Sequence, residues 1–349
     1  MINDNDYKVA VRCYTFNHAP YIEDALRGFA IQKTTFPVVY CIVDDASTDG
    51  ESEVIRNWAT NNLVFNAEIN LGHESSSYGE RYVGKLKDNQ NSLFVIVLLN
   101  EIHYRKKSKL PYIKDWYDYA KYHAICEGDD YWIDPLKLQK QVDFMEEHDD
   151  CSMVFHNSYK EDADTGKRKG FHKIYKKSRY TPLAHIIRDG GFIPTASIIY
   201  RSNILDQYAD FPKKCPAGDI KIQTYAALVG KVFYINEIMA VYRLVSTSST
   251  HIRMKSVDKY VSHQNQIIDW YKMVNEYTNH KYEKDIKGAV TFSEARIAIA
   301  QRKYYKFWNV KYWPYILNKP RIVQIGIFMS MIGFGGLSRL IHNTLNKIR

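Results

Sequence analysis

The stretch KVAVRCYTFNHAPYIEDALRGFAIQ, residues 8–32, contains two different hydrophobic patterns. Residues 8–14 form a short strand-like run, whereas the following residues share one face of a helix over 21–32: Tyr21, Ile22, Ala25, Leu26, Phe29 and Ala30. The next run, FPVVYCIV at 36–43, is apolar without alternation, as expected for a strand that is covered on both sides. A strand, a helix and a buried strand in this order predict a parallel unit of an α/β sheet.

The same alternation continues to about residue 160. Helices are predicted at 50–60 and at 134–148, where Asp134 and Pro135 are the expected N-cap and first helical residue. Strand-like runs are found at 63–68, 93–99, 122–126, 152–157, 195–200 and 231–236. We expect residues 100–121 to leave the sheet, 160–182 to form a mobile loop and 255–317 to be helical. The prediction is a mostly parallel sheet flanked by helices, with a helical C-terminal extension.

The composition is that of a globular protein of 349 residues, with 45% hydrophobic and 25% charged residues. The formal net charge of +9 suits nucleic acid, anionic lipid or a phosphorylated substrate equally well. Because the chain has no basic low-complexity tail and no zinc-finger spacing, we expect no nucleic-acid partner. Five scattered cysteines without a CxxC pair, and a polar start that is not typical of a signal peptide, predict a cytoplasmic protein with reduced thiols.

Four polar segments follow predicted strands. They are Thr15-Phe16-Asn17, the Asp-rich run 44–49 with Asp44 and Asp45, Asn70-Leu71-Gly72, and CEGDDYW at 126–132 with Glu127, Asp129 and Asp130. Each segment alone is also what an ordinary turn or helix cap contains. Since ligands of such sheets bind beyond the carboxyl ends of the strands, we expect the four segments to meet along one edge.

This edge has the groups that a nucleotide diphosphate requires. Phe16 offers a flat face for a base, main-chain N–H groups around Thr15 suit polar edges, and the Asp45 carboxylate can accept a hydrogen bond from the N3–H of uracil or from another base. Glu127, Asp129 and Asp130 can supply one or two oxygen ligands to Mg²⁺ or Mn²⁺, with the diphosphate and water supplying the others. Three neighbouring carboxylates repel one another unless a cation is present, and neighbouring Lys or Arg side chains are the alternative to a metal.

Two of these segments resemble a known family. VAVRCYTFNHAPYIEDALRGFAIQK and VVYCIVDDASTDG are similar to the N-terminal segment of family 2 glycosyltransferases, and CEGDDYWIDPLKLQKQVDFME is similar to their Asp-x-Asp region. The resemblance covers roughly residues 7–250. It implies a GT-A fold, a nucleotide-sugar donor, a divalent metal and inverting transfer in the synthesis of cell-surface polysaccharide or glycolipid. It assigns Asp45 to the base, and Glu127, Asp129 and Asp130 to ribose and metal.

The sequence departs from the family pattern in three places. Glu127 stands where the first Asp is expected, Phe16 stands where Tyr is common, and the stretch between Gly72 and Glu127 is longer than usual. The resemblance also divides the chain into a GT-A domain at 1–250, with its nucleotide-binding part at 1–160 and its acceptor part at 161–250, and a helical region at 251–349.

A base is required because inverting transfer removes a proton from the attacking hydroxyl. Asp219, in AGDIKIQTYAALVGK at 217–231, resembles the catalytic-base position of the family, and it is also suited to cap the next helix. Arg243 and His251 are expected to approach the diphosphate, with a surface role as the alternative.

The last segment, 320–349, contains 17 residues without a charge from Ile322 to Ser338, flanked by basic residues such as Lys319 and Arg339. This pattern is short for a transmembrane helix and suits an interfacial helix on an anionic membrane. We expect a peripheral contact at the inner face of the cytoplasmic membrane, near a glycan or lipid-linked glycan acceptor. The alternative is a terminal helix that packs on the protein.

Three other functions compete with glycosyl transfer. A sugar nucleotidyltransferase normally carries a Gly-rich phosphate loop after its first strand, and YTFNHAPY at 14–21 has no glycine. A phosphatase with an aspartyl nucleophile needs Asp-x-Asp where Thr15 and Asn17 stand. A non-catalytic carbohydrate- or lipid-binding protein would not depend on Asp219 or on the acidic segment.

Overall fold

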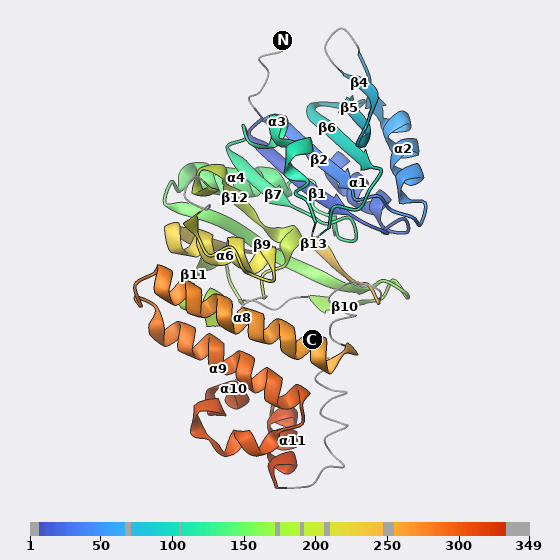
Figure 1. The fold of residues 1–349 in the computed structure, drawn as a ribbon. Helices are drawn as coiled ribbons and strands as arrows, with labels where there is room; N and C mark the ends of the chain where they lie inside the picture. Colours follow the sequence, from blue (N-terminus) through green and yellow to red (C-terminus); the bar gives the residue numbers. More distant parts are fainter. Residues whose placement is uncertain are drawn as a thin grey trace. The chain divides into compact units, whose positions relative to one another are not determined.

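The computed structural model describes residues 7–66, 71–104, 106–171, 175–188, 192–205, 210–246 and 255–332. The chain divides into two compact units, and Figure 1 shows its elements. Unit 1 comprises Met1–Leu183, Gly191–Ala209 and Ile222–Ser246, and unit 2 comprises Ala184–Gly190, Asp210–Lys221 and Thr247–Arg349.

Unit 1 is built on one large sheet with the strand order β11-β13-β9-β12-β7-β1-β2-β6-β5-β3. Its centre is parallel and consists of β7 (Tyr122–Ile125), β1 (Val9–Thr15), β2 (Val38–Asp44) and β6 (Asn89–Leu99). Thr15, Asp44 and Leu98 are in register at the carboxyl edge of this centre. A second parallel pair joins β9 (Cys151–Asp162) to β13 (Lys231–Leu244).

The other pairings are antiparallel. They involve β3 (Leu63–Val64), β4 (Gly72–Ser76), β5 (Gly79–Leu86), β8 (Tyr131–Trp132), β10 (Arg168–Phe171), β11 (Arg179–Thr181) and β12 (Ile199–Arg201). The predicted α/β class, a sheet flanked by helices with a helical C-terminal region, is therefore confirmed. The sheet is parallel only at its centre and in the β9–β13 pair, and the other described pairings are antiparallel, so it is less parallel than the sequence predicts.

The alternation along β1 explains why both faces of the sheet are covered. Val9, Val11 and Cys13 pack into a core that includes residues of α1 (Ile22–Ala30), α2 (Glu51–Asn62) and α4 (Lys137–Glu147). Ala10 packs on the opposite face, with the short helix α3 (Lys114–Tyr117) and the turn η2 (Leu110–Tyr112). Each central strand is thus buried on two sides, as its continuous apolar run predicts.

Several elements differ from the sequence prediction. The range expected to be a mobile loop, 160–182, holds the end of β9 together with β10 and β11. The hairpin of β4 and β5 was not predicted, because its polar strand β4 lacks an apolar alternation. Helix α4 begins at Lys137 instead of Pro135, since the Asp134 carboxylate accepts the N–H of Leu136 at 2.8 Å and forms a turn before the helix.

The remaining helical elements follow β11. They are α5 (Leu183–Arg188), η3 (Thr195–Ser197), η4 (Ser202–Leu205), α6 (Gly218–Val229), α8 (Val257–Tyr277), α9 (Glu283–Ala300), η6 (Tyr304–Trp308), η7 (Val310–Tyr312), α10 (Trp313–Leu317) and α11 (Arg321–Met331). In unit 2, the elements from α9 to α11 share a small apolar core that includes Phe292, Phe307 and Ile327. Among the residues that the structure describes, no helix has the length and apolar character needed to cross a bilayer.

Candidate active site

The candidate site lies at the carboxyl edge of the parallel strands in unit 1. The loops that follow β1 and β7 touch there, because a Cβ atom at Gly128 would collide with the side chain of Thr15. The Gly128 N–H also points to the Tyr14 carbonyl at 3.4 Å. Glycine at 128 is therefore required by the close approach of these two loops.

Glu51, the first residue of α2, joins the loops after β1 and β2. Its carboxylate is fully buried and accepts hydrogen bonds from the Thr15 hydroxyl and from the His18 N–H at 2.9 Å. The Ser47 hydroxyl lies 2.8 Å from Glu51 and also within hydrogen-bond distance of Asp44, so the two carboxylates share its single proton. Burial raises the pKa of Glu51, and its hydrogen bonds oppose that shift. Sequence reasoning missed Glu51, since an acidic residue in the first turn of a helix is common and its partners in the β1 loop are more than 30 positions away.

The predicted residues Thr15, Phe16 and Asn17 have different surroundings. The Thr15 hydroxyl is buried and bonded to Glu51, whereas Asn17 adopts a φ of +56° and accepts the Thr48 N–H at 2.8 Å through its side chain. The Phe16 ring is 38% exposed at the turn. Phe16 and Asn17 are both exposed, and Phe16 is the one that offers an aromatic face to a ligand.

Asp44 and Asp45 are both buried at the end of β2. The Asp44 carboxylate accepts hydrogen bonds from the Ser47 N–H at 3.1 Å and from the Ser52 hydroxyl, and it shares the Ser47 hydroxyl with Glu51. The Asp45 carboxylate accepts the N–H groups of His103 at 2.6 Å and Tyr104 at 2.9 Å, and the Lys109 ammonium at 2.8 Å. Asp45 therefore anchors the segment that follows β6, a contact that its sequence position did not reveal.

The acidic segment after β7 shows a gradient of exposure. Glu127 is exposed, Asp129 is half-buried and Asp130 is 2% exposed. Asp130 accepts the Arg243 N–H at 2.9 Å, and its pKa is raised by burial first and by the Asp129 charge second. The His18 ring lies 3.8 Å from the Asp129 carboxylate and so links this segment to the β1 loop.

Arg243, which was predicted to approach the diphosphate, is 7% exposed beneath this segment. Its guanidinium donates to Asp24, to Glu161 at 3.3 Å and to the Asp129 carbonyl at 3.2 Å, and it lies 4.3 Å from the centre of the Tyr131 ring. These contacts position the main chain of residues 129–131.

The acidic segment has the donor set of a hard divalent cation. Its carboxylate oxygens are the ligands that Mg²⁺ and Mn²⁺ prefer, and a cation would offset the repulsion between Asp129 and Asp130, which Arg243 offsets only in part. In the part of the chain that the structure describes, no three His, Cys, Asp or Glu side chains are grouped as a complete metal site. The segment suits a metal that takes one or two protein ligands.

Of the four remaining predicted residues, the structure describes Gly72 and Asp219. Gly72 begins β4, where it pairs with Val83 of β5, and β5 and β6 separate it from β2. The prediction that Gly72 joins the edge fails because the strand expected before it pairs only at Leu63–Val64 and is antiparallel. Asp219 lies half-buried in the first turn of α6 and belongs to unit 2. Asn70 and His251 lie outside the described residues.

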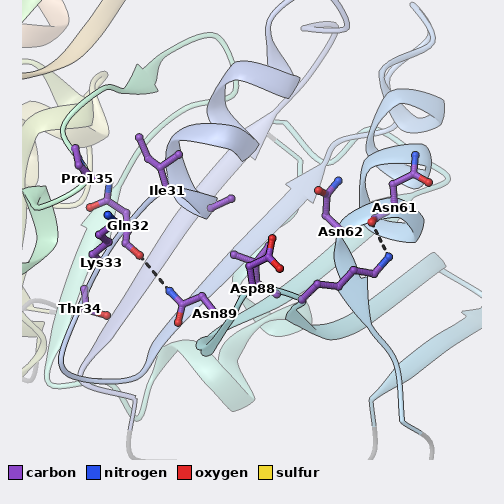
Figure 2. A pocket seen from close by; sticks show the side chains of 12 residues that line it. Ile31, Gln32, Lys33, Thr34, Asn61, Asn62, Asp88, Asn89 and Pro135 are labelled. Carbon is purple, nitrogen blue, oxygen red and sulfur yellow. Dashed lines mark hydrogen bonds between the residues drawn. The ribbon is translucent and has the colours of Figure 1, made fainter.

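A pocket of about 860 Å³ lies at the opposite end of the sheet from the candidate site, next to the C-terminal ends of α1 and α2 (Figure 2). Its polar groups bond to the chain itself. The Asn89 side chain donates to the Gln32 carbonyl at 3.1 Å, and the Lys87 ammonium donates to the Asn61 carbonyl at 2.6 Å. Gln32 in turn donates to the Asp134 carbonyl at 2.9 Å. These hydrogen bonds connect the loops that line the pocket, and none of the predicted site residues lies in it.

Comparison with known proteins gives relatives of two kinds. No protein-family model matches the chain. Three mycobacterial proteins, uncharacterized protein Mb1547 of Mycobacterium bovis and uncharacterized proteins MT1570 and Rv1520 of Mycobacterium tuberculosis, are each 31% identical to it over 229 residues. The match covers 66% of this chain and 56% of each relative, so the chain spans just over half the length of these relatives.

The fold is similar to that of S. aureus TarS. The crystal structure of TarS 1-349 has a TM-score of 0.51 and 13% sequence identity, and covers 98% of this chain and 92% of that one. The crystal structure of TarS 1-349 in complex with UDP-GlcNAc has the same TM-score, identity and coverage. At this identity the likeness concerns the fold, and it agrees with the GT-A architecture expected from the sequence.

Proposed function

We propose that this protein is an inverting glycosyltransferase that moves a sugar from a nucleotide-diphosphate donor, most simply a UDP-sugar, to an acceptor hydroxyl. The observation that carries the proposal is the edge where the loops after β1, β2 and β7 interlock through Glu51, Gly128 and His18. This is the edge at which sheets of this kind bind nucleotides. The TarS fold, solved with UDP-GlcNAc, supports the same reading.

In this proposal different residues at the edge contact the base, the ribose and the diphosphate of the donor. The exposed Phe16 ring stacks on the base, and the buried Asp45, which the sequence assigns to the base, holds the segment after β6 beside it. Glu127 and Asp129, whose side chains reach the surface, serve the ribose and the metal, with Asp130 behind them. A bound Mn²⁺ or Mg²⁺ supplies the positive charge that stabilises the departing diphosphate. Arg243 acts as a positioning residue, since its guanidinium is bonded to Asp24 and Glu161.

The proposed reaction balances without a redox partner. The acceptor oxygen forms a bond to the anomeric carbon, the bond between that carbon and the diphosphate oxygen breaks, and the leaving nucleotide diphosphate keeps the electron pair. Asp219 is the proposed base that takes the hydroxyl proton. The proposed acceptor is a glycan or lipid-linked glycan of the cell surface, and the proposed location is the inner face of the cytoplasmic membrane.

A donor panel tests this function. UDP-GlcNAc, UDP-glucose, UDP-galactose and GDP-mannose are incubated with the protein, with Mn²⁺ or with EDTA, and release of nucleotide diphosphate and the thermal transition are measured. We expect one donor to stabilise the protein and to release its diphosphate only with metal. Asp129→Asn should lose this release, whereas Asp88→Asn, an exposed carboxylate at the opposite end of the sheet, should keep it. No response to any donor would contradict the proposal. Release of pyrophosphate when the protein is given a sugar 1-phosphate and a nucleoside triphosphate would indicate a nucleotidyltransferase.

A further inference from the structure

The C-terminal elements of unit 2 expose an unusual amount of apolar surface. Of the 21 large apolar side chains that are exposed in the described part of the chain, nine lie between Tyr305 and Ile332. Val310, Leu317 and Trp313 are 70%, 68% and 51% exposed, and Trp308 is 58% exposed. These nine side chains lie on η6, η7, α10 and α11 and directly after α11, elements that are orange to red in Figure 1.

Helix α11 shows that this exposure is not simply a poorly packed core. Val323 and Ile327 are buried in the small core of unit 2, whereas Ile322, Ile325 and Phe328 are exposed and recur at a spacing of three residues. The helix is therefore apolar on two faces, of which one is already occupied. An apolar face that stays exposed to water costs free energy unless a second apolar phase covers it.

The charge of the same region indicates which apolar partner covers this face. After Glu294 the chain contains ten of its 48 Lys and Arg residues and none of its 39 Asp and Glu residues. Residues 1–294 therefore contain 38 basic and 39 acidic residues, a formal charge of −1. The net positive charge of the protein comes from the last 55 residues. Lys303 and Arg321 are exposed within this region, next to exposed apolar side chains.

A second copy of the chain fits this surface poorly. In a symmetric dimer the same patch faces itself, so this basic patch, in which Glu294 is already paired with Lys311 at 2.8 Å, would meet its own charge. An anionic bilayer suits both the apolar side chains and the basic charge of this surface. Trp and Tyr side chains prefer the headgroup region, and Lys or Arg side chains are attracted to acidic lipids. At 11 residues, α11 is about 17 Å long, which allows it to lie in the interface and not to span the membrane.

We infer that residues 302–332 form a membrane-binding surface that docks unit 2 on anionic lipid through Trp308, Trp313 and the exposed face of α11. This inference goes beyond the proposed transfer reaction and does not depend on it. It also places the membrane contact earlier in the chain than the uncharged tail alone would suggest.

Flotation of the full chain with vesicles tests the inference. The vesicles consist of phosphatidylcholine alone or of an equal mixture with phosphatidylglycerol, at low and at high salt. Wild-type protein should bind the mixed vesicles at low salt, bind them less at high salt and bind phosphatidylcholine weakly. The double variant Trp308→Ser/Trp313→Ser should lose affinity for the mixed vesicles by on the order of tenfold.

Two matched controls separate binding from folding. The double variant Tyr119→Ser/Val229→Ser removes two exposed apolar side chains from unit 1 and should bind vesicles like wild type. The thermal transition of each variant shows whether it is folded. If the Trp308→Ser/Trp313→Ser protein is folded and floats like wild type, or if wild type does not bind mixed vesicles at low salt, the inference is wrong. It is also wrong if sedimentation shows a dimer that these substitutions dissociate.

Discussion

The loops after β2 and β7 are both rich in carboxylates, and the structure uses them differently. Asp44, Asp45 and Glu51 are buried, and each accepts at least two hydrogen bonds from the chain itself. In the other loop, Glu127 is exposed and Asp129 is half-buried. Composition alone does not separate the two loops. Exposure does, because the second loop presents Glu127 and Asp129 to the surface, and we therefore propose that the first loop is mainly scaffold and the second mainly a ligand site.

The largest expected effect follows from Asp129→Asn. If the loop after β7 serves the metal and diphosphate, this substitution should lower turnover of the donor found in the panel by about a hundredfold or more. Its half-buried side chain makes few bonds in the protein, so the thermal transition should move little. Steady-state kinetics and a melting curve measure both quantities. A loss of stability with unchanged turnover per folded molecule would reverse the comparison between the loops.

Glu51→Ala should mainly affect stability. It leaves the Thr15 hydroxyl and the His18 N–H without their buried acceptor, which should lower the free energy of unfolding by about 3 kcal/mol, whereas the Ser47 hydroxyl keeps Asp44 as its acceptor. Urea unfolding measures this loss, with the exposed Glu147→Ala as the control, for which little change is expected. If Glu51→Ala unfolds like wild type, the loop after β2 is not the scaffold described here.

Lys137, which is buried beside Trp132 at the end of the loop after β7, should make the stability of the protein depend on pH. Its ammonium is buried 4.0 Å from the centre of the Trp132 ring and donates to Gln141 at 2.8 Å, and burial lowers its pKa to about 7. Below pH 7 the folded protein must hold a buried charge. As pH rises above 7, the folded state loses this proton while the unfolded state keeps it up to its ordinary pKa of 10.5, so stability should rise.

Comparison of wild type with Lys137→Met isolates this term. Between pH 7 and pH 8.5 wild type should gain about 2 kcal/mol relative to the variant. Urea unfolding at the two pH values measures the difference. Equal pH dependence in the two proteins would show that Lys137 does not titrate in this range.

Asp45→Asn has the smallest expected effect and sharpens the comparison most. The amide cannot accept from both N–H groups and the Lys109 ammonium as a carboxylate does, so we expect a loss of about 1 kcal/mol in stability. Hydrogen exchange at His103 and Tyr104 should become faster. If exchange there is unchanged while affinity for UDP falls, Asp45 contacts the base and does not anchor the segment after β6.

Sequence patterns predicted the central strands and helices well, because their continuous apolar runs and helical periods reflect local burial. They also identified Thr15, Asp45 and Asp129 at one edge, since parallel strands end together. They missed Glu51 as the joining residue and the contact of Asp45 with His103, because these bonds connect positions that are tens of residues apart. They misplaced Gly72 because β4 and β5 form a polar hairpin with little apolar alternation.

The most direct test is calorimetric titration of UDP into wild type and Asp129→Asn, each with Mn²⁺ and with EDTA, and with uridine as the ligand that lacks the diphosphate. We expect Mn²⁺ to tighten UDP binding to wild type, Asp129→Asn to lose that increase while keeping its affinity in EDTA, and uridine to be insensitive to the metal. An Asp129→Asn protein that keeps the full Mn²⁺ effect, or a wild type that binds no UDP under either condition, would contradict the assignment of the loop after β7 as the metal and diphosphate site.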